Sequence, residues 1–369
     1  MTITLRPTVA RVDTSAIVAN YRALGRAAGR RVLPVVKADA YGHGAAAVGR
    51  ALEAAGTDFL CVAIAEEGAA LRRAGVGCRI LLLNYCCALD AGFLRAYGLT
   101  PSISSPELAR EFAQATEGFS EPLAVHVNVN TGMNRLGVDE RELPDVLEAL
   151  GRAKGLAVEA FFTHFSHGDE PDGVAMASQE DRASRLFSEL RAHPVLRGAW
   201  THAANSGAAL SGKGAWADAV RPGIALFGVA PGPPSGVTLV PALAWETEVM
   251  AVRRVPAGTP VGYGGTFVAS RESVLATLPV GYDDGYRRAF AGRVPVLLPG
   301  GKAPVVGAVS MDLTVCDATD TGARRGDRVV LLGTSGGETV TAEEMARAAG
   351  TIAYEIFCGI GRRVPRVTA

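Results

Sequence analysis

Residues 32–44 read VLPVVKADAYGHG, an apolar run that ends on a lysine and passes directly into a glycine-rich turn. The run at 32–36 is short and rich in β-branched side chains, as expected of a buried strand. Lys37 therefore lies at the end of a predicted strand. An apolar setting lowers the pKa of an amine, which can then attack an aldehyde to form a Schiff base. On this local pattern alone, a lysine that merely extends from the strand end into solvent is an equally good interpretation.

The same pattern, a short apolar run followed by an amphipathic stretch, repeats over the first two-thirds of the chain. The predicted strands are 32–36, 59–63, 80–83, 101–103, 124–129, 158–162, 199–204 and 220–227. Helices are predicted to begin near Asp13, Ser105 and Ser178, which can cap a first turn. Eight strand–helix units predict an α/β barrel of the TIM-like (β/α)8 kind, with active residues at the C-terminal ends of the strands. An open doubly wound sheet is the alternative, because periodicity does not distinguish a closed sheet from an open one.

The character of the sequence changes at PGPPSG, residues 231–236, which is typical of a linker or a surface turn. Beyond it, β-rich segments separated by Gly, Pro and Asp occur at 242–255, 294–298, 305–309, 313–316 and 328–332. We therefore predict two domains, a barrel over residues 1–235 and a mainly β domain over residues 236–369. The first strand, about residues 1–12, could pair with the second domain instead of the first.

Composition excludes several classes of partner. Lys and Arg total 37, as do Asp and Glu, which argues against a nucleic-acid or other polyanionic partner. No apolar segment has the roughly 20 residues needed to span a bilayer, and residues 1–9 lack a signal-peptide core, so a cytoplasmic location without membrane contact is expected. The six cysteines form no CxxC pair and are interpreted as small buried side chains. His164 and His167 would face opposite sides of a strand, so no metal site is predicted.

Further motifs follow Lys37 in order along the chain. They are TGMNRLG at 131–137, FTHF at 162–165, HAANS at 202–206, RPGI at 221–224, GYG at 262–264, VGYDDGY at 280–286, SMD at 310–312 and RVPR at 363–366. Together with KADAYGHG at 37–44, they resemble the motifs of the alanine racemase family over nearly the whole chain. The resemblance implies a fold-type III enzyme, a homodimer that uses pyridoxal 5′-phosphate to interconvert L- and D-alanine. Such an isomerase has a small amino-acid substrate and supplies D-alanine for peptidoglycan precursors.

The resemblance also implies a pair of catalytic groups. Lys37 would hold the cofactor as a Schiff base and act as one acid/base, and Tyr263 of the partner subunit would be the opposing base. Inverting a stereocentre needs a proton removed on one face and delivered on the other. Because a phenol with its ordinary pKa near 10 is a poor base at neutral pH, the site must favour the phenolate form of Tyr263.

The remaining roles implied by the resemblance concern the cofactor and the substrate carboxylate. Arg221 would contact the pyridine nitrogen, and because a guanidinium is effectively always protonated, that nitrogen stays unprotonated and racemisation is favoured over transamination. Arg135 would contact the cofactor phenolic oxygen and the substrate carboxylate, the backbone N–H of Met311 would also bind that carboxylate, and His164 would lie against the cofactor ring. The expected phosphate ligands are Tyr41, Ser206, Gly223, Ile224 and Arg362. The expected supporting residues are Asn128, His202, Tyr282 and Asp312.

Three positions depart from the family pattern. Asn128 occupies the place of a carbamylated lysine that, in many members, orients the arginine equivalent to Arg135, and Asn130 replaces a frequent Asp. Arg362 replaces a tyrosine beside the substrate side chain, so a serine/alanine or broader-specificity racemase is the alternative function.

Three other functions are also compatible with parts of the sequence. A decarboxylase of the same fold type would need a cysteine proton donor, for which Cys316 and Cys358 are candidates by residue type only. A non-catalytic pyridoxal phosphate carrier is disfavoured by the second domain. A barrel that binds an unrelated phosphorylated ligand would show no Schiff-base absorption.

Overall fold

The computed structural model describes residues 5–368 and divides into two compact units. We call residues 15–40 and 45–240 the barrel unit. Of the described residues, 5–14, 41–44 and 241–368 form the second unit, which we call the β unit. Within the described range, no helix is long and apolar enough to cross a membrane.

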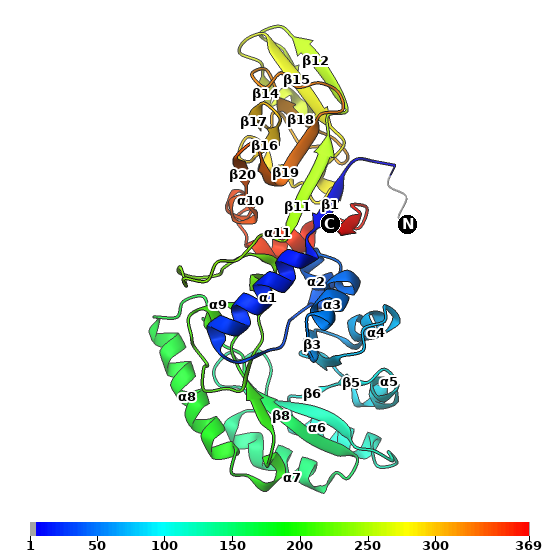
Figure 1. The fold of residues 1–369 in the computed structure, drawn as a ribbon, viewed down its shortest axis with the longest axis vertical. Coiled ribbons are helices and arrows are strands. Elements are labelled where there is room, and N and C mark those ends of the chain that lie inside the picture. The colour runs from blue at the N-terminus through cyan, green and yellow to red at the C-terminus, as the bar shows by residue number, and fades with distance from the viewer. Residues whose placement is uncertain (1–4, 369) are drawn as a thin grey trace. The chain divides into compact units, whose positions relative to one another are not determined.

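The strands of the barrel unit lie among its helices (Figure 1), and all their pairings are parallel. They are β2 (Arg31–Val32), β3 (Phe59–Val62), β4 (Arg79–Leu82), β5 (Leu99–Thr100), β6 (Ser102–Ile103), β7 (Leu123–Asn128), β8 (Leu156–Phe162), β9 (Trp200–His202) and β10 (Ala219–Val220). One ladder runs β2-β10-β9-β8-β7-β6 and another β3-β4-β5. Only Pro101 separates β5 from β6, and a parallel bridge between Val35 and Cys61 joins the other two edges. Counting β5 and β6 as one, the described strands form the predicted eight-stranded barrel.

Helices alternate with these strands. They are α1 (Thr14–Ala28), α3 (Ala45–Ala54), α4 (Ala65–Arg73), α5 (Ala91–Ala96), α6 (Pro106–Ala115), α7 (Leu143–Arg152), α8 (Val174–Leu190) and α9 (Ser206–Leu210). Ser105 caps α6 as predicted, since its Oγ accepts the Leu108 N–H at 3.1 Å. The predicted start at Ser178 is wrong, because α8 begins at Val174. The extra turn buries Met176, a packing contact that a capping pattern does not report.

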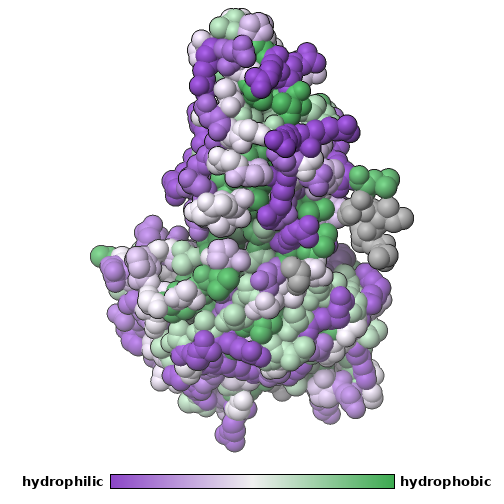
Figure 2. Space-filling model, turned by 45° about the horizontal axis from the view of Figure 1, so that its top comes forward, coloured by the Kyte–Doolittle hydropathy of each residue, from purple (hydrophilic) through white to green (hydrophobic). Residues whose placement is uncertain are grey.

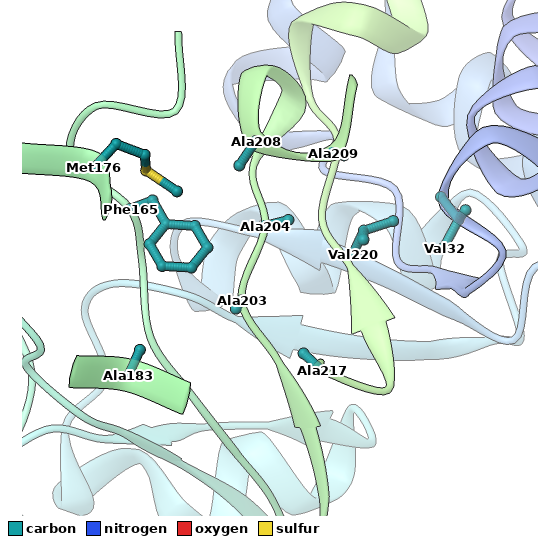
Figure 3. Close-up of a cluster of buried hydrophobic side chains, with 10 residues drawn as sticks. All are labelled: Val32, Phe165, Met176, Ala183, Ala203, Ala204, Ala208, Ala209, Ala217 and Val220. Carbon is teal, nitrogen blue, oxygen red and sulfur yellow. The ribbon is translucent and has the colours of Figure 1, made fainter. Parts of the chain in front are cut away.

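A cluster of small side chains packs around the last barrel strands (Figure 3). It comprises Val32, Phe165, Met176, Ala183, Ala203, Ala204, Ala208, Ala209, Ala217 and Val220, all of them buried. Alanines on both sides of residue 206 let α9 approach the strand ends closely. Shape complementarity in this cluster therefore positions the segments that carry Ser206 and Arg221.

The β unit is built mainly from antiparallel strands. They are β1 (Val9–Val12), β11 (Leu243–Glu248), β12 (Ala251–Val255), β13 (Pro260–Val261), β14 (Phe267–Val268), β15 (Ser273–Leu278), β16 (Pro295–Leu298), β17 (Gly301–Pro304), β18 (Thr314–Asp317), β19 (Arg328–Ser335), β20 (Glu338–Val340) and β21 (Arg366–Thr368). The main sheet has the order β17-β16-β19-β11-β1-β21. In it, β1 pairs antiparallel with β11 and parallel with β21. Helices α10 (Ala342–Ala349) and α11 (Ala353–Gly359) follow β20.

Four predicted strands are wrong in extent. Of residues 32–36 only Val32 belongs to β2, because Pro34 has no N–H, and Val35 pairs in an isolated bridge to Cys61. Of residues 199–204 only Trp200–His202 form β9. Of residues 220–227 only Val220 belongs to β10, because Pro222 lacks an N–H and the chain then enters the 3-10 turn η4 (Ile224–Phe227). Of residues 305–309 only Val305 pairs, in an isolated bridge to Cys316, because the chain turns at Gly307, whose φ is +68°.

The surface and the cysteines agree with a globular protein. Hydrophilic residues cover much of the face seen in Figure 2, and smaller groups of hydrophobic residues lie among them. The six cysteines form no disulfide in the described chain. The prediction that they are buried is confirmed for Cys61 and Cys316 only, because Cys78, Cys86 and Cys87 are partly buried and Cys358 is exposed.

Candidate active site

Lys37 is the first residue of a short left-handed helix. Helix α2 (Lys37–Gly42) follows the buried residue Val36, whose N–H donates to the Cys61 oxygen at 2.8 Å, and residues 38–41 all have φ between +52° and +55°. None of these four residues is a glycine. A left-handed helical backbone costs roughly 1–2 kcal/mol per residue for L-amino acids. Backbone strain of this kind persists only where the surroundings hold it, and it clusters at functional sites.

Two carboxylates hold this left-handed turn. Glu67, in α4, accepts the N–H of Ala38 through Oε1 and the N–H of Ala63 through Oε2, both at 2.7 Å. Asp39 accepts the N–H of Ala45, also at 2.7 Å. Hydrogen bonds to a charged acceptor are about twice as strong as neutral ones. The position of the Lys37 backbone is therefore set from a helix that sequence reasoning did not connect with it.

Lys37 lines a cavity at the C-terminal ends of the barrel strands. Lys37, Asn128, Arg135 and His164 all line it, and it encloses about 470 Å³, part of which is open to solvent. Four residues that sequence reasoning placed in the site are thus brought together within the barrel unit.

Asn130 shapes the turn that carries Arg135. Its Oδ1 accepts the N–H groups of Gly132 and Asn134, each at 3.1 Å, and its Nδ2 donates to Asn134 Oδ1 and Asp139 Oδ1 at 2.9 and 2.8 Å. Asn134 has a φ of +56°, a conformation that Asn tolerates better than most residues. The neutral amide therefore both donates and accepts, which a carboxylate at this position would not do.

Arg221 is fully enclosed by barrel side chains and backbone. Its Nη1 lies 2.5 Å from His202 Nδ1, and its Nη2 donates to the backbone oxygens of Thr163 and Ala203 at 2.6 and 3.0 Å. Burial lowers the pKa of Arg221 to about 10, which leaves it charged at neutral pH. Among residues 5–368, no acceptor contacts its buried Nε–H. An acceptor without a proton, such as a pyridine nitrogen, would satisfy that group.

His164 is held neutral beside this cation. Its Nδ1 lies 3.4 Å from Arg221 Nη2. Burial, followed by the positive charges of Arg221, Arg135 and Lys37, lowers the pKa of His164 to about 3. An uncharged imidazole at neutral pH can pack against a ring or accept a hydrogen bond.

Ser206 accepts hydrogen bonds from two backbone N–H groups that follow the last strand of the barrel. Its Oγ accepts the N–H of Gly223 at 2.9 Å and the N–H of Ala225 at 3.3 Å, which leaves its own proton available to donate. The turn η4 begins at Ile224, and the first N–H groups of a helix have no partner within it. This group of donors matches the anion site common at late strands of (β/α)8 barrels.

In the β unit, the residues predicted to face a partner subunit lie at the surface. Tyr263 is 75% exposed and Met311 is 52% exposed. Gly262, just before Tyr263, lies against Ala308, so the two loops adjoin. Both side chains are accessible to a second molecule.

A network of charges fixes the loop that carries Met311. Asp284 is fully buried and lies 2.9 Å from Arg363 Nε, and Arg363 Nη2 donates to Asp312 at 2.7 Å. Burial opposes ionisation of Asp284, but hydrogen bonds from Arg6 and Arg363 outweigh it and lower its pKa. The N–H of Tyr282 donates to the Ser310 oxygen at 3.0 Å. Tyr282 and Asp312 thus support this loop from two sides.

The other two predicted phosphate ligands also belong to the β unit. Tyr41 is buried, and its ring centroid lies 5.9 Å from that of Tyr354. The next residue must be a glycine, since a Cβ on Gly42 would come within 2.4 Å of the Phe357 oxygen. Arg362 is exposed.

A strand-end lysine, a buried arginine with an open donor and a serine–amide anion site define a barrel enzyme that binds a phosphorylated pyridine aldehyde. The residues present fit such a cofactor, because the buried Nε of Arg221 finds no acceptor in the described chain.

Comparisons with known proteins agree with this class. The family model for the alanine racemase N-terminal domain matches residues 12–231, and the model for the C-terminal domain matches residues 242–368. An alanine racemase of Symbiobacterium thermophilum is 43% identical over 366 residues, which cover 98% of this chain and 97% of that protein. The chain belongs to the alanine racemase family.

Solved structures give the same result. Alanine racemase from Bacillus anthracis with bound L-Ala-P has a TM-score of 0.92 at 32% identity, covering 100% of this chain and 96% of that one. The Bartonella henselae enzyme with covalently bound pyridoxal phosphate has a TM-score of 0.88 at 31% identity, covering 98% of this chain and 99% of that one. The predicted fold, a (β/α)8 barrel with a β domain, is confirmed.

Proposed function

We propose that this enzyme interconverts L- and D-alanine with Lys37 and Tyr263 of the partner subunit as its two acid–base groups. The enzyme is an isomerase of the alanine racemase family, and its cofactor is pyridoxal 5′-phosphate. The placement of Lys37 in one cavity with Arg135 and His164, at the ends of the barrel strands, carries the proposal.

Pyridoxal 5′-phosphate, when bound, withdraws electrons from the α-carbon of an amino acid and makes its proton removable. Lys37 would hold the aldehyde carbon of this cofactor, and Arg221 Nε its ring nitrogen. Ser206, Tyr41, Arg362 and the N–H of Ile224 would hold its phosphate, together with the N–H of Gly223 once that group is released from Ser206 Oγ.

Arg221 determines the type of reaction in this proposal. Because its pKa is about 10, it keeps its proton at neutral pH and serves only as a donor. A donor that keeps its proton would leave the ring nitrogen of a bound cofactor unprotonated. Arg221 would in this way favour return of a proton to the α-carbon over transamination.

Lys37 and Tyr263 would act on opposite faces of the substrate. One removes the α-proton while the other delivers a proton from the other side, and the roles exchange in the reverse direction. Arg135 and the backbone N–H of Met311 would fix the substrate carboxylate between them. Neutral His164 would pack against the cofactor ring without adding a charge.

The homodimer is part of the proposal. Exposure of Tyr263 and Met311 in the single chain supports their contribution to a neighbouring site. A cytoplasmic location and the supply of D-alanine for peptidoglycan complete the proposed role.

Complementation between two inactive variants tests the shared site. Lys37→Ala and Tyr263→Phe should each lower racemisation in both directions equally, by roughly 10²–10⁴-fold, because inversion needs both groups. A mixed dimer pairs an intact Lys37 with an intact Tyr263 at one of its two sites. Half of randomly mixed dimers are mixed, so about a quarter of wild-type activity should return on exchange of subunits. A chiral assay of L-Ala, D-Ala and L-Ser provides the measurement.

Four comparisons make this experiment decisive. Tyr97→Phe, which changes a partly buried tyrosine packed on Phe93, should keep full activity. If Tyr263→Phe alone kept full activity, Tyr263 would not be the second base. If the mixture stayed inactive, each chain would build its site alone. Equal or faster turnover of L-Ser than of L-Ala would overturn the assignment of alanine as the substrate.

A further inference from the structure

A line of hydrogen-bonded side chains runs through the barrel interior behind Arg221. Arg221 Nη1 lies 2.5 Å from His202 Nδ1, and His202 Nε2 lies 2.9 Å from His126 Nδ1. His126 Nε2 in turn lies 3.2 Å from Glu159 Oε2, and Arg79 Nη2 donates to the same carboxylate at 2.5 Å. All five residues belong to the barrel unit.

A β-bulge places the carboxylate at the end of this line. Val125 of β7 pairs with Val158 of β8, but the next residue, His126, pairs with Ala160. Glu159 is therefore the extra residue of the bulge. A bulge changes the direction of a side chain relative to regular pairing. Here the carboxylate reaches the buried ring of His126, while its own side chain is 19% exposed.

The two ends of the line fix the direction of every hydrogen bond. A guanidinium has no acceptor, so Arg221 donates and His202 Nδ1 accepts. His202 then carries its proton on Nε2 and donates to His126 Nδ1, and His126 donates from Nε2 to Glu159, because an ionised carboxylate only accepts. Both histidines are thereby neutral Nε2–H tautomers.

The surroundings of the line support this assignment. His126 and His202 have no exposed surface, and Phe162 stacks on His202 with ring centroids 4.5 Å apart. Trp200 meets the His126 ring edge-on at 5.1 Å. Burial lowers the pKa of both histidines, and it outweighs the opposing influence of Glu159 on His126. The carboxylate of Glu159 stays ionised, since its pKa is also lowered by His126 and Arg79 in spite of burial.

We infer that Glu159, acting through His126 and His202, is a positioning residue for Arg221. By accepting the last hydrogen bond it locks both histidines in one tautomer and keeps an acceptor facing Arg221 Nη1. The opposite tautomers would turn an N–H of His202 toward the guanidinium, and Arg221 would then move. This inference rests on the proposed role of Arg221 at the ring nitrogen.

The test follows the tautomer of a residue that Glu159 does not touch. In Glu159→Gln the end group can donate as well as accept, so the direction of the line is fixed from the Arg221 end alone, and the opposite tautomers become accessible when Arg221 moves. The ring nitrogens of ¹⁵N-histidine-labelled holoenzyme are observed by NMR, with His126→Asn and His202→Asn identifying their signals among the six histidines. Wild type should show Nε2–H tautomers at both positions. In Glu159→Gln the His202 signals should move toward a mixture of tautomers, and kcat should fall roughly tenfold with little change in KM.

Glu180→Gln is the matched control. Glu180 also has a 19% exposed side chain and an ion pair, 3.4 Å from Lys213, but it lies outside the line. It should leave the His202 signals and kcat unchanged. Unchanged His202 signals in both Glu159→Gln and His126→Asn would overturn the inference, whatever the activity. The tautomer measurement does not depend on Tyr263, so the proposed function can fail separately.

Discussion

At the scale of single residues, Glu67 determines where the catalytic lysine lies. Its two carboxylate oxygens accept the N–H groups of Ala38 and Ala63, each at 2.7 Å. An amide can accept with one of these atoms only, because the other carries hydrogens.

Glu67→Gln should therefore lower the free energy of unfolding of the cofactor-free barrel by about 1 kcal/mol, because one charged hydrogen bond is lost. Displacement of the Lys37 backbone should also weaken binding of pyridoxal phosphate severalfold. Urea unfolding and cofactor titration measure the two effects. Glu66→Gln, one residue earlier on an exposed position, should change neither. Equal effects of the two variants would show that Glu67 acts only through its charge.

The sequence predicted Lys37, Arg221 and the other motif residues, but it did not predict their supports. Glu67 is 29 residues from the backbone N–H that it accepts, and an acidic residue in a first helical turn has an ordinary explanation in the helix dipole. Glu159 reaches His126 only because a bulge interrupts β8. Interactions of this kind depend on strand register, which a single sequence does not specify.

At the scale of elements, the left-handed helix α2 is the feature least expected from sequence. The eight barrel strands followed from the alternation of apolar runs and amphipathic stretches. The ends of the predicted strands 220–227 and 305–309 failed where Pro222 and Gly307 redirect the chain. In α2, tertiary contacts impose a conformation that local preference opposes.

Ala38→Gly should raise the free energy of unfolding by about 1 kcal/mol, because Ala38 is exposed and has a φ of +52° that glycine adopts without strain. Ala70→Gly provides a control of opposite sign. Ala70 is also exposed but lies in the right-handed helix α4, so its replacement should lower stability by about 0.5–1 kcal/mol. Thermal and urea unfolding measure both changes. Destabilisation by Ala38→Gly would contradict the idea that α2 is strained.

At the scale of the whole molecule, the barrel encloses three neutral histidines. Burial lowers the pKa values of His126, His164 and His202 in the folded state. In the unfolded chain a histidine takes up a proton below about pH 6.5. As the pH falls below that value, the unfolded state binds protons at these histidines and the folded state does not, so the free energy of unfolding decreases.

His164, whose folded-state pKa is about 3, should reduce the ratio of folded to unfolded protein roughly tenfold per pH unit between about pH 6 and pH 4.5. His202 and His126 should add to this slope over the range in which each stays neutral in the folded state. Urea unfolding followed by the fluorescence of Trp200 and Trp216 measures this dependence. His164→Gln should remove one tenfold factor from the slope. An unchanged slope would mean that His164 is protonated in the folded barrel.

The main sheet of the β unit joins the two ends of the described chain, since β1 pairs with both β11 and β21 (Figure 1). This pairing determines the order in which the two units can fold during translation. All segments of the barrel unit are made by residue 240, so that unit can fold while synthesis continues. Among the described strands, β1 leaves the ribosome before the others but obtains its second partner only when residues 366–368 emerge. Until then, this strand has an unpaired edge that a chaperone could shield.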